Sequence, residues 1–73
     1  MNNITPERLA KYFDYTKRAL DEARKAVDGS SRAMEFLDMA SRYYSDAVHF
    51  HSKSDDVTAF AALNYAHGWL DAG

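Results

Sequence analysis

Apolar residues recur at spacings of three and four along almost the whole chain, and only two short polar breaks interrupt them. This spacing places the apolar side chains on one face of an α-helix. The breaks, at residues 28–31 and 52–54, are so short that consecutive helices must run antiparallel. The pattern predicts an all-α fold, an up-down-up three-helix bundle. Its helices are expected at about residues 6–27, 32–52 and 55–71 of a single domain spanning 1–73.

The first predicted helix has clear signals at both ends. Thr5 is a good N-cap, Pro6 suits the first helical position, and Gly29 is expected to be a left-handed C-cap. The helix carries one apolar stripe, formed by Leu9, Tyr12, Phe13, Thr16, Ala19, Leu20, Ala23 and Val27. Its opposite face carries acid–base pairs four residues apart, namely Glu7–Lys11, Asp14–Arg18 and Asp21–Lys25.

The second predicted helix is apolar over more than half of its circumference. Ser30 or Ser31 is expected to cap it, and its polar residues follow a narrow strip. A helix that is apolar over so wide an arc has neighbours on two sides. We therefore expect it to be the central helix of the bundle.

The third predicted helix, capped by Ser54, has no charged residue between Asp56 and Asp71. Its first face contains Ala59, Phe60, Leu63, Ala66, His67 and Leu70. Its second face contains Val57, Ala61, Asn64, Tyr65, Gly68 and Ala72. Two interpretations are open for the second face: the other two helices cover much of it, or it meets another chain. A helix in a three-helix bundle normally buries one stripe, which favours the second interpretation.

The small number of large hydrophobic residues points the same way. The 73 residues include 13 Leu, Ile, Val and Phe together, 12 alanines and no cysteine, with a net charge of -2. This composition excludes a multidomain enzyme and a disulfide-bonded module, and it predicts a thin, alanine-rich core. Domains of this size obtain only ~3–5 kcal/mol from their own core, and oligomerisation is one way to add stability.

These patterns favour a non-catalytic interaction module that associates through its C-terminal helix, as a homo-oligomer or by docking on a protein partner. Small residues would set the distance of approach, and aromatic residues would supply buried area. The mid-helix Gly68 costs about 1 kcal/mol relative to alanine, which suggests that its missing side chain is useful. The predicted interaction surface is Val57, Ala61, Asn64, Tyr65, Gly68 and Trp69.

The alternative is a small-ligand site between the second and third helices, formed by Tyr44, His67 and Asp71. His67 and Asp71 are one helical turn apart, as in an acid–base pair. A bundle of this size rarely provides the pocket that catalysis needs, so we assign no catalytic residue. His49 and His51 are two residues apart and face different directions, although His51 could pair with His67 across the bundle. The ligand types and spacings do not match a metal site, and no cofactor is expected.

Charge and hydropathy argue against two further classes of partner. A sequence pI near 5.8 is unlike that of a dedicated nucleic-acid binder, because acids are interleaved with the basic residues of the first helix. The longest uncharged run, residues 57–70, is shorter than the roughly 20 residues that cross a bilayer. The start of the sequence lacks the pattern of a secretory signal, so a cytoplasmic location is expected.

The C-terminal run from Ala62 to Gly73, above all Tyr65-Ala66-His67-Gly68-Trp69-Leu70-Asp71, resembles the signature of a small archaeal family known as domain of unknown function 357. The Thr-Pro start and the tyrosine-rich first helix are similar to that family as well. The resemblance implies a left-handed three-helix bundle, an archaeal and cytoplasmic origin, and no assigned catalytic residues. Relatives joined to nucleotide-transferring domains extend the alternative hypothesis to an accessory domain of such an enzyme.

Overall fold

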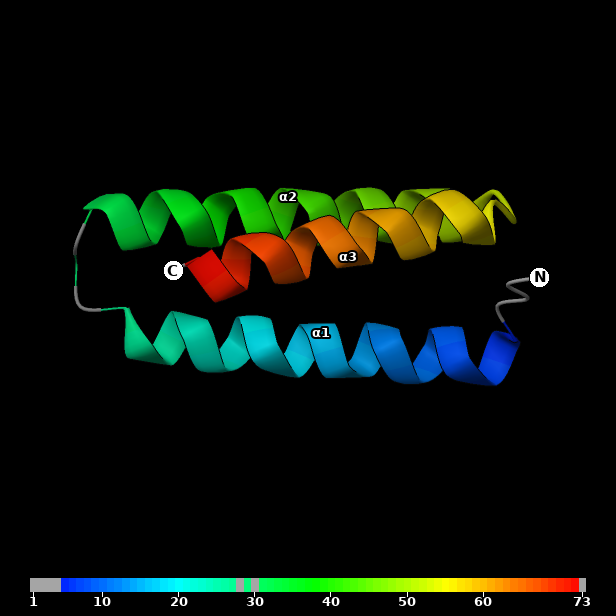
Figure 1. The fold of residues 1–73 in the computed structure, drawn as a ribbon, viewed down its shortest axis with the longest axis horizontal. Coiled ribbons are helices and arrows are strands. Elements are labelled where there is room, and N and C mark those ends of the chain that lie inside the picture. Colours follow the sequence, from blue (N-terminus) through cyan, green and yellow to red (C-terminus); the bar gives the residue numbers. More distant parts are fainter. Residues whose placement is uncertain (1–4, 28, 30, 73) are drawn as a thin grey trace.

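A computed structural model of the chain describes residues 5–27, 29 and 31–72. They form three helices, α1 (Pro6–Ala26), α2 (Ser31–Ser52) and α3 (Asp56–Ala72), with no strand in these ranges. Consecutive helices run antiparallel, so α1 and α3 point the same way (Figure 1). The all-α, up-down-up prediction is confirmed, and each helix boundary lies within one residue of its expected position.

Helix α1 begins with the predicted cap. The Thr5 side chain accepts a hydrogen bond of 3.1 Å from the backbone N–H of Arg8, and Pro6 occupies the first turn. The helix ends at Ala26 with Val27 as its C-cap, so Gly29 lies beyond the cap. Gly29 has a φ of +90°, a left-handed backbone conformation that glycine adopts easily. Of the two expected caps of α2, Ser30 lies outside the described residues.

The junction between α2 and α3 corrects the prediction that Ser54 caps the third helix. The N–H of Asp55 bonds to the Phe50 carbonyl at 2.9 Å and that of Ser54 to the His51 carbonyl at 3.0 Å. These bonds form a Schellman ending for α2, which places Ser54 at a φ of +62°. An N-cap residue needs extended backbone, so the role passes to Asp55, whose carboxylate accepts from the Thr58 N–H at 3.2 Å.

The core lies mainly around α3. Four of its residues are buried, Ala59, Ala62, Leu63 and Ala66, whereas α2 buries only Ala40 and Ala47. Helix α3 packs closely along α2 and also contacts α1, while α1 and α2 contact each other least. The expectation that the second helix is central is therefore wrong. Its apolar arc contains large side chains that stay half-buried at its edges, and Val48 remains 48% exposed.

The main buried cluster and an apolar recess lie toward different ends of the bundle. Leu9 and Leu63 pack with Ala47 and Ala62, and half-buried aromatic rings cover this cluster. At the end where α1 is joined to α2, an apolar recess of about 170 Å³ remains. It is lined by Ala23, Ala26, Val27, Ala33, Phe36, Leu37, Trp69 and Leu70. None of the described helices is long and apolar enough to cross a bilayer.

Candidate interaction face

The second face of α3 is open to solvent along its whole length. Val57 is 72% exposed and Tyr65 is 62% exposed. Exposed residues complete the face, and they are small or uncharged: Ala61, Asn64, Gly68 and Ala72. Neither α1 nor α2 covers this face, so the interpretation that they shield it within one chain is wrong. We call these six residues the outer face of α3.

Gly68 lies in the middle of the outer face, and no contact within the chain requires a glycine at this position. A Cβ added at this position would meet no atom within 4 Å, so no neighbour requires the glycine. Its φ is outside the left-handed range, and the residue is part of the helix. Neither packing nor backbone conformation within the chain explains its presence.

Aromatic contacts border the outer face on the side of α2. The Tyr65 ring stacks on Tyr43 with centroids 5.3 Å apart and planes 28° apart. One turn later, Trp69 packs against Phe36 at 5.4 Å. Trp69 is half-buried, so among the predicted surface residues it lies at the edge rather than on the open face.

On the side of α1, the outer face is bordered by a polar contact. The Tyr12 hydroxyl donates to Asn64 Oδ1 at 2.6 Å. Partial burial raises the pKa of Tyr12 above its ordinary value of 10.0, and the nearby Tyr15 and Asp71 raise this pKa further by smaller amounts. Asn64 is therefore engaged with α1 while the residue as a whole stays exposed.

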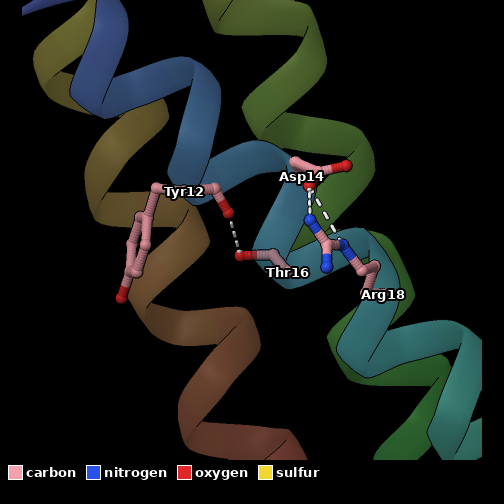
Figure 2. A network of polar contacts seen from close by, with 4 residues as sticks. All are labelled: Tyr12, Asp14, Thr16 and Arg18. Carbon is pink, nitrogen blue, oxygen red and sulfur yellow. Dashed lines mark hydrogen bonds and ion pairs between the residues drawn. The ribbon is translucent and has the colours of Figure 1, made fainter.

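His67 faces α1 and not α2, which differs from the ligand site expected between the second and third helices. Its Nε2 lies 2.7 Å from the Thr16 hydroxyl, which itself donates to the Tyr12 carbonyl at 2.7 Å (Figure 2). The hydroxyl has one proton, so Nε2 must carry the hydrogen of its own bond.

Two tyrosine rings hold the imidazole of His67 in place. Its centroid lies 5.1 Å from that of Tyr12 and 5.0 Å from that of Tyr15, with planes 25° and 21° apart. Together with the bond to Thr16, these contacts attach α3 to α1. The interpretation of His67 as a residue bonded across the bundle is supported.

The other members of the alternative ligand site are not joined to His67. Tyr44 packs edge-on against Phe13 of α1 with centroids 6.0 Å apart. Asp71 is exposed, and within the described residues no hydrogen bond joins it to His67. The geometry therefore gives this ligand site no support.

The histidines are also kept apart. His51 Nδ1 lies 3.1 Å from Asp56 Oδ1, and the His51 ring packs on Phe13, so it does not pair with His67. His49 is exposed and contacts Phe50. In the described part of the chain, no three His, Cys, Asp or Glu side chains gather as metal ligands.

Comparison with known families matches this chain to the sequence model described as "Protein of unknown function (DUF357)", over residues 11–73. The chain belongs to this family. Its match covers all of α2 and α3 and most of α1, so it includes the outer face and the His67 contacts. Neither the curated proteins nor the solved structures include a match. The DUF357 match supplies no site residues.

The structure also shows a group of residues that the sequence patterns did not single out. Arg8 and Lys11 lie beside three aromatic rings in a recess between α1 and α3. The sequence contains part of this group, because Arg8 and Tyr12, like Lys11 and Tyr15, are four residues apart and so share one face of a helix. The spacing of residues does not predict that Phe60 of α3 joins this group, because the contact between Phe60 and Tyr12 depends on how each helix is rotated about its axis.

Proposed function

We propose that this DUF357 chain is a non-catalytic helical interaction module that associates through the outer face of α3. The occupant of the face is a second copy of the chain or a protein partner. The exposed Val57 and Tyr65 supply apolar area, and no charge lies between Asp56 and Asp71 to oppose burial. The family resemblance supports an archaeal source and a cytoplasmic location as further parts of this proposal.

The observation that carries the proposal is the open space around Gly68. A glycine inside a helix costs about 1 kcal/mol relative to alanine, and no contact within the chain requires it. A second helix packed across the face would use the missing side chain, because small residues allow backbones to approach closely. Ala61 and Ala72 are small, exposed residues of the same face, and they lie before and after Gly68 along the helix.

The aromatic border supports the same role. Tyr65 is held by its stack on Tyr43, so its exposed ring loses little conformational freedom when a partner covers it. Tyrosine and tryptophan are enriched among residues that dominate binding energy. Tyr65 and the edge residue Trp69 would be the anchors, with the small residues between and beside them.

Substituting Gly68→Glu and measuring mass by light scattering tests self-association. We expect the wild type to exceed the monomer mass at high micromolar concentration and the variant to return to it. Ser45→Glu, on the exposed side of α2, is the matched control and should keep the wild-type mass. If the wild type is monomeric and all three chains behave alike, the occupant is not a second copy.

The partner version is tested with the same variants as bait in extracts of the native host. One stoichiometric protein should be recovered by the wild type and by Ser45→Glu, and lost with Gly68→Glu. Equal recovery by all three baits would show that binding does not use the outer face. A monomeric wild type that also recovers no partner would contradict the proposed function altogether.

A further inference from the structure

A second feature borders the outer face on the side of α1, between α1 and α3 near the start of α1. It is a recess of about 400 Å³ lined by Arg8, Lys11, Tyr12, Tyr15 and Phe60. Ligand pockets have volumes of roughly 300–1,000 Å³. The recess falls in this range, but it is shallow and largely open to solvent, so a small ligand would lie on it with one side exposed.

Its two cations are free to bind an anion. Arg8 and Lys11 lie one helical turn apart, and neither side chain has an ion-pair partner among the described residues. The expected Glu7–Lys11 pair is not formed there. Further along the same helix, by contrast, Arg18 is bonded to Asp14 (Figure 2). Arginine and lysine are the usual ligands of phosphate and carboxylate groups.

Its aromatic wall offers a stacking surface. Tyr15 lies against His67 on one side, with planes 21° apart, yet 61% of the residue is exposed. One face of the ring is thus fixed while the residue remains open to a ligand. The Tyr12 ring lies 5.0 Å from Phe60 and its hydroxyl is bonded to Asn64, so Tyr12 contributes its ring only. Base–aromatic stacking is worth about 1–3 kcal/mol per base.

The charges orient a ligand in this recess. Three carboxylates of the described residues lie near this recess: Glu7 precedes Arg8, Asp14 precedes Tyr15 and is paired with Arg18, and Asp71 acts on Tyr12 from the end of α3. Because α1 and α3 run in the same direction (Figure 1), Asp71 lies toward the opposite end of α1 from Arg8. An anionic group is therefore favoured beside Arg8 and Lys11, and the planar part of a ligand beside Tyr15.

We propose that this recess binds a small planar anion of the nucleoside monophosphate type, with its phosphate on Arg8 and Lys11 and its ring on Tyr15. The residues that carry the proposal are on α1, and none of them belongs to the outer face of α3. The proposed site therefore adjoins the outer face through the Tyr12–Asn64 bond but shares no residue with it.

An NMR titration of the full chain with adenosine monophosphate tests this site. Saturable amide shifts are expected at residues 8–15 and at Phe60. Adenosine and inorganic phosphate, each lacking half of the ligand, should bind about tenfold more weakly than the monophosphate. Raising the salt concentration should weaken the binding of the monophosphate more than the binding of adenosine.

Matched variants test which residues bind the phosphate of the ligand and which bind its ring. Arg8→Gln combined with Lys11→Gln should weaken monophosphate binding about tenfold and leave adenosine binding unchanged. Tyr15→Ala should weaken both by about fivefold or more. Lys25→Gln, an exposed cation at the far end of α1, is the control and should bind like the wild type. Thermal unfolding of each variant reports whether the fold is kept.

Three results would overturn the proposal. The first is the absence of saturable shifts with adenosine monophosphate. The second is equal binding by the wild type and by the folded Arg8/Lys11 double variant. The third is a single-stranded RNA that binds about a hundredfold tighter than the monophosphate and shifts residues outside the recess, because it would indicate a polynucleotide surface.

Discussion

The buried hydroxyl of Thr16 joins α1 to α3. It is fully buried, it donates to the carbonyl of its own helix at Tyr12, and it accepts from His67 of α3. Every described buried side-chain polar atom has a hydrogen-bond partner, and this hydroxyl is the centre of the arrangement. In a thin core, a polar contact of this kind determines which face of α3 meets α1.

Thr16→Val should destabilise the chain by about 1–3 kcal/mol, measured by urea denaturation. Valine has nearly the same shape, but it leaves the N–H of His67 without an acceptor. Thr16→Ser is the control, because it keeps the hydroxyl and loses only a methyl group. A valine variant as stable as the wild type would show that the Thr16–His67 bond is not important for the attachment of α1.

The stability of the chain should fall as the pH rises above the ordinary tyrosine pKa of 10.0. Burial raises the pKa of Tyr12 in the folded state, so the unfolded chain loses this proton first. The Tyr12 contribution is complete below the ordinary value and is lost as the pH rises through the raised one. Tyr12→Phe should flatten this part of a stability–pH curve obtained from thermal melts. Parallel curves for the two proteins would contradict the assignment.

At the scale of the helices, the turn between α2 and α3 is the least expected element. Ser54 adopts a φ of +62°, a conformation that costs a residue with a Cβ roughly 1–2 kcal/mol. It is maintained by the two Schellman bonds of the α2 ending and by the Asp55 cap of α3. The turn therefore stores a small strain that glycine would remove.

Ser54→Gly should raise the free energy of unfolding by about 1 kcal/mol, which corresponds to roughly 4–8 °C in melting temperature for a domain of this size. Ser52→Gly is the control two residues earlier, at the last residue of α2, where glycine should be destabilising because the backbone is helical and the Ser52 hydroxyl bond to the His49 carbonyl is lost. The comparison needs only thermal melts monitored by circular dichroism. If both glycines lower the melting temperature, the left-handed strain at Ser54 is not significant.

The helices could be predicted from the sequence because their signals are local. Thr5 and Pro6 mark a start by their own chemistry, and apolar spacing gives the inward stripe of each helix. The cap at Asp55 was missed because Ser54 is an equally good cap by residue type, and only the backbone at the turn distinguishes them. The partner of His67 was missed for a related reason. Spacing identifies the face of a helix but not which neighbour lies against it.

At the scale of the whole molecule, α3 has the most buried residues of the three helices, and it also exposes Val57 and Tyr65 on its outer face. Its inner face is built from alanines and Leu63, which lets it lie close to α2, and its outer face has no cover. Of the large aliphatic and phenylalanine side chains in the described part of the chain, Leu9, Leu20 and Leu63 are buried, Val48 and Val57 are exposed, and the others are half-buried. This division agrees with a domain that is completed by contact with another molecule.

Gly68→Ala tests this account most directly, because its two expected effects have opposite signs. The added Cβ has open space within the chain, so the free chain should become more stable by about 0.5–1 kcal/mol. The same methyl group should hold a second helix away from the outer face and raise the dissociation constant of the complex, with a second copy or with the recovered partner. Thermal melts and sedimentation equilibrium measure the two quantities on one preparation. A more stable variant that associates as tightly as the wild type would contradict the role of the outer face.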